Sequence, residues 1–286
     1  MLKIVPGQVP QPKLHEYLLS CVAPRPISFV STIDAAGNVN LAPFSFFNIF
    51  GSNPPVLVFS PAISGRTGKS KNTLDNLKEV GECVVNIVSY DMIHQCNLAA
   101  AEYEKGIDEF ERAGFHKVPS EFVKPPRVAE SKAHIECKVL QIIETGTGGG
   151  AGNLVLCEIL ALHIHESVMD ESGSVSPYKF DQIARMGKNY WARTIPESII
   201  EMPRTPDATK VIGVNALPHF IRTSKYLSGN DIALLANNET LPTHAQAAPY
   251  QHLQNQTKET IANQCKEQLK NGNLTEALCI AMLLAE

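Results

Sequence analysis

The chain has 286 residues, enough for one large domain or for an ordinary domain with an appendage. Its 25 Lys and Arg residues nearly balance its 29 Asp and Glu residues, for a formal net charge of -4. This charge gives no electrostatic reason to expect nucleic acid or an anionic membrane as a partner. The N-terminal residues lack the apolar core of a secretory signal, and no run approaches the ~18 apolar residues of a membrane span. We therefore expect a cytoplasmic protein.

The first part of the chain is dominated by strand patterns. Residues 26–33, 39–47 and 56–60 are predicted to be extended, and a turn cluster at 34–38 joins the first two as a hairpin. Residues 72–80 carry leucines at helical spacing before Gly81, which predicts a helix that ends there. Another strand is predicted over residues 83–88.

The middle of the chain contains the strongest β pattern. Residues 134–144 and 154–166 flank the glycine-rich segment 146–152, which predicts an antiparallel hairpin. Before it, a helix is predicted over residues 92–101. The polar segment 102–126 is expected to be connecting structure, a lid or an excursion, with a short helix near 108–113.

The composition changes after about Pro196, where prolines break the chain into short pieces and polar helical patterns follow. We predict a mainly β domain with peripheral helices over residues 1–205 and a partly helical C-terminal extension over residues 206–286. The last predicted helix, 275–286, has an apolar face that needs a surface to cover, because so short a helix is marginal alone.

Three motif-like features do not support the chemistry that their letters suggest. The seven cysteines form no CxxC pair, so we expect buried reduced thiols rather than a metal cluster or disulfide framework. Gly68-Lys69-Ser70 matches the end of a P-loop, but Ile63 stands where the first glycine is required. The glycine-rich segment 146–151 matches a dinucleotide fingerprint, but a strand follows it instead of a helix, so a flexible hairpin turn is the preferred interpretation.

His163 and His165 lie two residues apart on a predicted strand, so both could face a metal, with Glu158 and Glu166 as oxygen ligands. The carboxylates have no diagnostic spacing. We therefore predict hydrogen-bonded structural histidines and no metal site.

A basic loop precedes the helix predicted over residues 72–80. Cations and hydroxyls gather there, namely Arg66, Lys69, Ser70, Lys71 and Thr73. Because the amides at a helix N-terminus point outward, this composition suits a phosphate monoester. The alternative is a solvated basic loop that binds nothing.

Hydroxyl-bearing residues also lie in or beside apolar β segments: Ser28, Ser31, Thr32, Ser45 and Ser60. Each hydroxyl could simply return to the backbone. Together with the phenylalanines and Asn48 of residues 44–48, however, they offer an apolar face, amide edges and phosphate donors. A flat phosphorylated cofactor needs these groups.

Several blocks resemble a known family when they are taken together. Arg25-Pro-Ile-Ser-Phe-Val-Ser-Thr32, Asn40-Leu-Ala-Pro-Phe-Ser-Phe-Phe47 and Lys71-Asn-Thr73 resemble the FMN-binding flavin-reductase-like family, in particular its flavoredoxin-like branch. Residues 81–86, 152–158 and 184–190 are similar to further family blocks in the same order. The resemblance spans about residues 15–195, and it implies no chemistry for the part after about Pro206.

The resemblance implies a six-stranded split β-barrel that forms a homodimer with FMN near the subunit interface. Ser31 and Thr32 would lie along the flavin edge. Ser45, Phe46, Phe47 and Asn48 would contact the ring and ribityl chain, and Ser60, Lys71 and Thr73 would serve the phosphate. Met186 and Tyr190 would approach the flavin. Asn72 stands where the family commonly has aspartate, a change that FMN binding should survive.

The leading functional hypothesis is an NAD(P)H-dependent FMN oxidoreductase of the flavin reductase kind, with a small molecule or a protein as electron acceptor. The competing hypothesis is a non-enzymatic FMN carrier that passes electrons to a protein partner. A metal-binding β-barrel protein that uses His163 and His165 is a third. In the first two, the chemistry belongs to the flavin, so the sequence needs no acid–base dyad or nucleophile triad.

Overall fold

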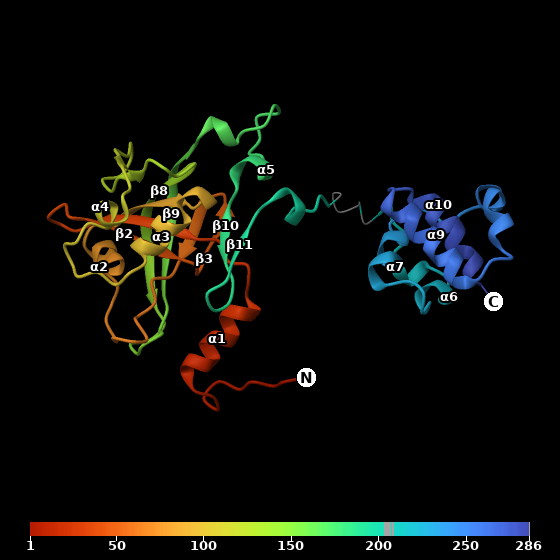
Figure 1. Cartoon of the computed structure of the whole chain (residues 1–286), viewed down its shortest axis with the longest axis horizontal. Helices are drawn as coiled ribbons and strands as arrows, with labels where there is room; N and C mark the ends of the chain where they lie inside the picture. The colour runs from red at the N-terminus through yellow and green to blue at the C-terminus, as the bar shows by residue number, and fades with distance from the viewer. Residues whose placement is uncertain (203–206, 208, 286) are drawn as a thin grey trace. The chain divides into compact units, whose positions relative to one another are not determined.

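The computed structural model describes residues 1–202, 207 and 209–285. Its contacts divide the chain into two compact units, Met1–Ile200 and Glu201–Glu286. The first unit contains the strands, and the described part of the second is helical (Figure 1). The predicted boundary between residues 205 and 206 lies outside the described residues, and the division by contacts falls slightly before it.

Seven antiparallel strands form the main sheet in the order β2-β1-β5-β8-β9-β4-β3. They are β1 (Ser28–Ile33), β2 (Val39–Phe44), β3 (Phe47–Ser52), β4 (Pro55–Phe59), β5 (Glu82–Ile87), β8 (Ala133–Glu144) and β9 (Asn153–Ile164). The sheet has seven strands and not the expected six, because the segment predicted over residues 39–47 corresponds to β2 and ends at the first residue of β3, which was not predicted as a separate strand. Ser45 and Phe46 separate them.

The connection between β2 and β3 explains why the sheet curls. These strands lie at opposite edges of the sheet, yet only Ser45 and Phe46 join them. Three residue steps span at most ~10 Å, so the two edges must approach each other at this corner. The strand order ends at β2 and β3 without a ladder between them in the described residues. The sheet is therefore strongly curled but not shown to close into a barrel.

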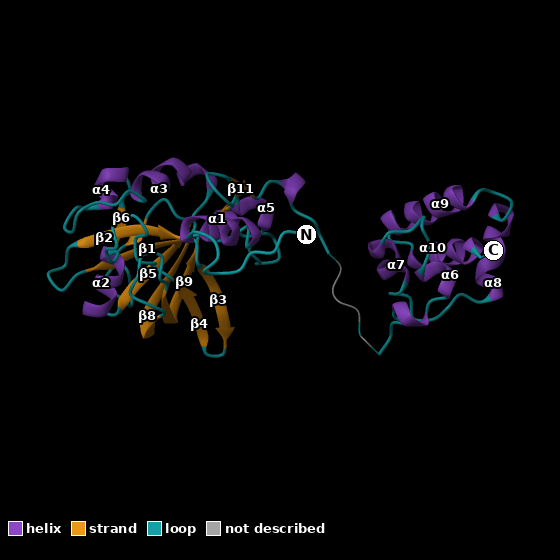
Figure 2. Cartoon of the chain, turned by 90° about the horizontal axis from the view of Figure 1, so that it is seen from below, coloured by secondary structure: helices purple, strands orange, loops and turns teal. Residues whose placement is uncertain are grey.

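Strand β1 is buried on both faces, because helices cover it from both sides (Figure 2). Phe29 belongs to a cluster with α3 (Ile93–Ala99) and α4 (Glu109–Ala113). The next residue, Val30, points to the other face and packs in a cluster with α2 (Asn72–Glu79). This second cluster fills the inside of the curled sheet.

Shorter elements surround the sheet. They are α1 (Gln11–Cys21), η1 (Tyr90–Met92), β6 (Lys117–Val118), β7 (Arg127–Val128), η2 (Glu166–Val168), α5 (Pro177–Phe180), β10 (Ile183–Arg185), β11 (Trp191–Arg193) and η3 (Pro196–Ser198). The sequence analysis did not predict α1. Leu14, Tyr17, Leu18 and Cys21 of this helix lie at helical spacing, a pattern that the sequence analysis did not use, and none of its eleven residues is buried.

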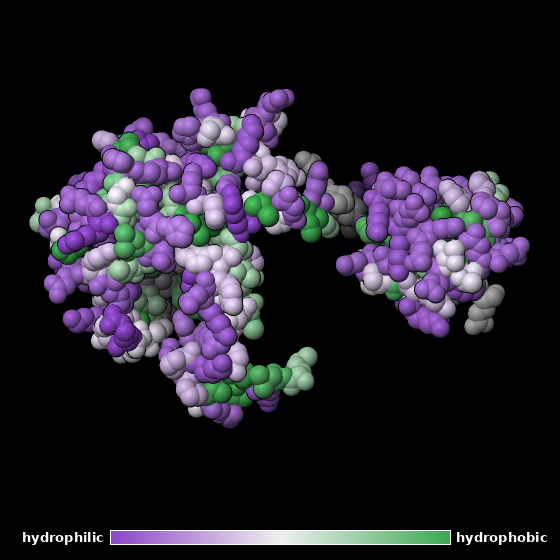
Figure 3. Space-filling model, in the orientation of Figure 1, coloured by the Kyte–Doolittle hydropathy of each residue, from purple (hydrophilic) through white to green (hydrophobic). Residues whose placement is uncertain are grey.

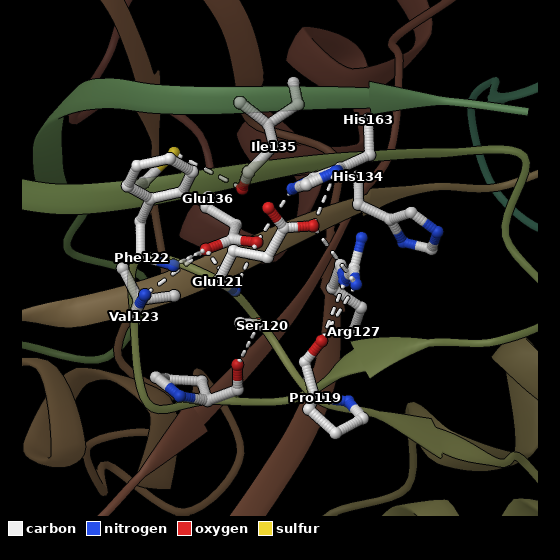
Figure 4. Close-up of polar contacts among 12 residues, drawn as sticks. Pro119, Ser120, Glu121, Phe122, Val123, Arg127, His134, Ile135, Glu136 and His163 are labelled. Carbon is white, nitrogen blue, oxygen red and sulfur yellow. Dashed lines mark hydrogen bonds and ion pairs between the residues drawn. The ribbon is translucent and has the colours of Figure 1, made fainter.

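A fully buried carboxylate fastens part of the polar segment 102–126 to the sheet (Figure 4). Glu136 of β8 accepts hydrogen bonds from the backbone N–H groups of Glu121 (3.0 Å) and Phe122 (2.6 Å). His163 of β9 lies 2.8 Å away through Nε2. Burial alone would raise the pKa of Glu136, but these donors together lower it. The segment is thus tied down by a charged group inside the fold.

The C-terminal unit has a hydrophobic core of its own. Its helices are η4 (Val214–Ala216), α6 (His219–Arg222), α7 (Gly229–Leu235), α8 (His244–Ala247), η5 (Ala248–Leu253), α9 (Lys258–Lys270), α10 (Leu274–Ala281) and η6 (Met282–Leu284). The helix predicted over residues 275–286 corresponds to α10 and η6, and Leu278 packs in the core with Ile261 of α9. The face of this unit seen in Figure 3 is mostly hydrophilic. Among the described residues, no helix is long and apolar enough to cross a membrane.

Candidate functional site

A cleft of about 1040 Å³ lies at the corner where the two sheet edges approach. Most of its lining comes from β2 with the corner residues, the loop between β4 and α2, residues 100–105 after α3, and one face of α1. The first turn of α2, Glu109 of α4 and Gly150 complete it. This volume is large enough for a small organic cofactor.

Aromatic side chains make one wall apolar. Phe44 and Phe46 line the cleft, and the Phe46 side chain is 42% exposed. Phe44 packs on Phe59, with ring centroids 5.8 Å apart, which fixes its position against the sheet. The His15 ring of α1 meets Phe46 edge-on at 6.4 Å. A planar ring could therefore lie against this wall without desolvating charged groups.

The N-terminal end of α2 also lines the cleft. Lys71 is the N-cap residue and no side chain caps the helix, so the N–H groups of Asn72 and Thr73 have no acceptor among the described residues, whereas those of Leu74 and Asp75 donate to the Lys71 carbonyl. Thr73 is buried and its Oγ1 accepts a hydrogen bond from Asn40 (2.9 Å), which leaves its O–H free to donate. This end of the cleft offers donors to an anion.

The carboxylate of Glu102 lies against the cationic side chains beside the N-terminus of α2. Glu102 pairs with Lys71, whose Nζ is 2.7 Å from its Oε1, and also with Arg66. The hydrogen bond from Lys71, followed by one from Ser64, lowers the pKa of Glu102 to about 2. The carboxylate is therefore ionised, and it occupies groups that the sequence assigned to a phosphate.

The glycine-rich hairpin turn shapes the loop between β4 and α2. The N–H of Gly150 donates to the carbonyl of Ile63 (2.9 Å), and a Cβ on Gly149 would lie 3.2 Å from the Cα of Gly65. Ser60 Oγ accepts a hydrogen bond from the N–H of Asn153 (3.0 Å). The hairpin-turn interpretation was correct, and small residues are required there because two loops pack closely.

A buried guanidinium connects two walls of the cleft with the turn between β10 and β11. Arg25 is 5% exposed and donates to Ser45 Oγ (3.3 Å), to the Val22 carbonyl after α1 (2.7 Å) and to the Met186 carbonyl (3.0 Å). No carboxylate pairs with it within residues 1–202 and 209–285. Burial, and to a lesser extent Arg185, lowers its pKa. The hydrogen bonds of Arg25 therefore fix the position of Ser45 and of the end of α1, which both belong to the cleft wall.

Glu109 of α4 is a second buried acid at the cleft. It is 3% exposed, and its Oε2 accepts a hydrogen bond from the N–H of Leu41 (2.9 Å). Burial raises the pKa of Glu109 to about 7, although the hydrogen bond from Leu41 opposes this shift. The cleft therefore contains one acid that changes charge near neutral pH.

The structure brings half of the predicted site residues into the cleft: Ser45, Phe46, Ser60, Lys71, Asn72 and Thr73. Ser31 and Thr32 do not line it. The Ser31 hydroxyl donates to the Pro126 carbonyl, and Thr32 Oγ1 accepts from Asn76 (3.1 Å).

The other four predicted residues also lie outside the cleft wall of this single chain. Phe47 packs in the core cluster inside the curled sheet, and Asn48 is exposed on β3. Met186 and Tyr190 belong to the turn between β10 and β11, where Tyr190 is 70% exposed.

The two strand histidines make structural contacts. His163 Nε2 lies 2.8 Å from Glu136 Oε1 (Figure 4). His165 Nδ1 accepts a hydrogen bond from the N–H of Ser167 and caps η2. Glu158 and Glu166 do not join them in a cluster of metal ligands, and no group of three such ligands occurs in the described part of the chain.

Sequence reasoning missed Arg25, Glu102 and Glu109 as parts of the site. Arg25 begins one of the family-like blocks, and that block was the only available signal for it. Glu102 and Glu109 come from a segment that the sequence analysis treated as a connection or lid, and their positions depend on how this segment folds back onto α2 and β2.

Comparisons with known proteins agree with this geometry. The model of the flavin reductase like domain matches residues 19–184. Nitrilotriacetate monooxygenase component B from Bacillus cereus aligns with a TM-score of 0.65 and 27% identity, over 72% of this chain and 98% of that one. The 2-nitrobenzoate 2-nitroreductase of Pseudomonas fluorescens aligns with a TM-score of 0.62 and 27% identity, over 72% and 100%. Flavoredoxin of Desulfovibrio vulgaris (Miyazaki F) shares the fold, with a TM-score of 0.55 and 21% identity over 71% and 97%.

Proposed function

Because the chain belongs to the flavin reductase like family, we propose that it binds FMN in the cleft and works as an NAD(P)H-dependent FMN oxidoreductase. The observation that carries the proposal is the composition of the cleft. An apolar aromatic wall and a cationic helix N-terminus lie in one space of suitable volume. This combination fits a cofactor with a planar ring at one end and a phosphate at the other.

In this proposal Lys71 and Thr73 hold the phosphate at the first turn of α2, with Ser60 and Asn72 beside them. Phe44 and Phe46 support the ring. The flavin would supply the capacity to accept a hydride and to pass electrons on. The chain's own residues bind and orient it, while α1 and residues 100–105 limit the access of water from the sides.

Substitutions at the phosphate end test the proposal. A charge-assisted contact contributes on the order of 1.5–3 kcal/mol, so Lys71→Ala should weaken FMN binding roughly ten- to a hundredfold. Thr73→Val should cost less. Riboflavin has no phosphate, so its binding should change little. Flavin fluorescence titrations measure both ligands, and equal losses for FMN and riboflavin would contradict the phosphate assignment.

Anaerobic reduction of the bound flavin distinguishes the reductase hypothesis from the electron-carrier hypothesis. If the protein is a reductase, NADH or NADPH should bleach the bound flavin in a stopped-flow experiment. A carrier of the flavoredoxin kind should not respond to either nucleotide but should be reduced by a protein donor. The similarity to a monooxygenase component and to a nitroreductase, each at 27% identity, supports the reductase hypothesis over the carrier hypothesis.

We also propose a homodimer. Large apolar side chains are exposed on β8, β9 and the edge strand β3, and the most exposed are Phe50 (66%), Leu162 (57%) and Leu140 (52%). Such surface is usually covered in soluble proteins, and two-fold association is the commonest way to cover it. Light scattering that found a monomer with FMN bound would exclude this arrangement.

A further inference from the structure

Glu102 uses both carboxylate oxygens on the cations of the cleft. Its Oε1 lies 2.7 Å from Lys71 Nζ, and its Oε2 pairs with Arg66. The side chains of Lys71 and Glu102 are each 32% exposed, so the pair lies at the wall of the cleft and solvent reaches it. Lys71 is also the residue assigned to the FMN phosphate.

This pairing does not depend on pH in the neutral range, because the pKa of Glu102 is about 2. Protonation therefore cannot release Lys71, and only another anion can take the place of the carboxylate. A phosphate monoester has a higher charge than a carboxylate and three acceptor oxygens, so it can compete for the same donors.

The surrounding contacts allow Glu102 to leave without unfolding its loop. Residues 100–105 also contact α2 through Lys105, which pairs with Glu79 at 3.2 Å, and through the Tyr103 carbonyl, which accepts from Asn72 Nδ2 (3.4 Å). Among the described residues 100–105, only Glu102 pairs with Lys71 and Arg66, the cations next to the N-terminus of α2. The loop can thus remain attached while the carboxylate turns away.

We propose that Glu102 is an internal competitor of the FMN phosphate, which sets how tightly this protein holds its cofactor. The inference rests on the proposed function, since it requires FMN in this cleft. Binding FMN then breaks the Lys71–Glu102 pair and brings a phosphate close to a remaining negative charge, and both effects weaken binding.

Glu102→Gln tests the competition, because it removes the charge and preserves the size of the side chain. Ion pairs with this exposure contribute at most about 1 kcal/mol, and repulsion of the phosphate adds a similar amount. The variant should therefore bind FMN roughly three- to thirtyfold more tightly than the wild type, with unchanged riboflavin affinity. Glu111→Gln is the control: Glu111 is exposed on α4, does not line the cleft and makes no ion pair in the described residues, so the substitution should change FMN affinity less than twofold.

A double substitution tests whether the effect passes through Lys71. In the Lys71→Ala background, Glu102→Gln should give only about half of the gain, on a free-energy scale, that it gives in the wild type, because the repulsion of the phosphate remains while the competition for Lys71 is lost. Weaker FMN binding by Glu102→Gln would mean that the carboxylate orients Lys71 for the phosphate, and would overturn the inference alone. An equal gain for riboflavin would overturn it as well. A wild-type protein that binds no FMN would instead reject the proposed function and this inference with it.

Discussion

At the scale of single residues, Arg25 has the largest structural role near the cleft. Its guanidinium satisfies backbone carbonyls at the end of α1 and in the β10–β11 turn, and it reaches Ser45 at the corner. Arginine is suited to this position because one planar group donates in several fixed directions, whereas lysine has a single point of attachment.

Replacing Arg25 should therefore destabilise the first unit. Arg25→Met fills a similar volume but leaves the carbonyls of Val22 and Met186 without a donor, which should lower the free energy of unfolding by about 2–4 kcal/mol. Arg25→Lys should recover part of this loss. Urea denaturation measures both variants, and a methionine variant as stable as the wild type would show that solvent satisfies these carbonyls.

Glu109 should make stability depend on pH. Burial raises its pKa from a usual value of 4.5 to about 7, so the folded protein holds this proton more tightly than the unfolded chain. The resulting stabilisation is full below pH ~4.5 and is lost as the pH rises through ~7. Between pH 5 and pH 8 the loss should be about 2.5 kcal/mol.

Glu109→Gln isolates this effect. A glutamine still accepts the hydrogen bond from Leu41 but cannot ionise, so its stability should lack this contribution. Urea unfolding at pH 5 and pH 8 should therefore show a larger fall for the wild type than for the variant. The same fall in both proteins would mean that the Glu109 carboxyl titrates near its ordinary pKa.

At the scale of elements, the sequence predicted what local patterns determine. The hairpin of β8 and β9 agrees with the predicted ranges 134–144 and 154–166 to within two residues, because alternation and a glycine turn are both local signals. The corner at Ser45 and Phe46 was missed, since an extended segment continues through it and only long-range pairing separates β2 from β3.

The cleft was partly predictable for the same reason. Lys71, Asn72 and Thr73 adjoin a helix N-terminus that the sequence predicts. Ser31 and Thr32 have the same appearance as site residues, a hydroxyl within an apolar strand, but their partners Pro126 and Asn76 come from distant segments. No local pattern distinguishes a hydroxyl that serves a ligand from one that closes a tertiary contact.

The position of α1 should depend on Gly187. A Cβ at this glycine would lie 2.9 Å from the Cα of Ser20, a distance that real Cβ atoms do not show. Gly187→Ala should shift α1 from its position at the cleft, weaken FMN binding roughly three- to tenfold and lower stability by about 1–3 kcal/mol. Gly148→Ala, where a Cβ meets open space, is the control. Unchanged FMN affinity in Gly187→Ala would show that α1 is not needed as a wall.

At the scale of the whole molecule, the chain consists of a flavin-reductase-like unit and a helical unit that the family model does not reach, since the match ends at residue 184. The core of the helical unit is built from its own residues, from Leu217 to Leu284. Every residue that lines the cleft lies before Ile200. The two units thus have separate means of burying their apolar side chains.

A chain truncated after Ile200 should therefore fold and bind FMN with an affinity within about twofold of the full-length protein. No core residue of the sheet unit is supplied by residues 207 and 209–285, so its unfolding midpoint in urea should also be nearly unchanged. Fluorescence titration and urea denaturation of both proteins measure this. If truncation removes FMN binding while the circular dichroism of the sheet unit is retained, the helical unit takes part in holding the flavin. If the truncated chain fails to fold, the two units are not independent, because the core of the first is incomplete without contacts from the second.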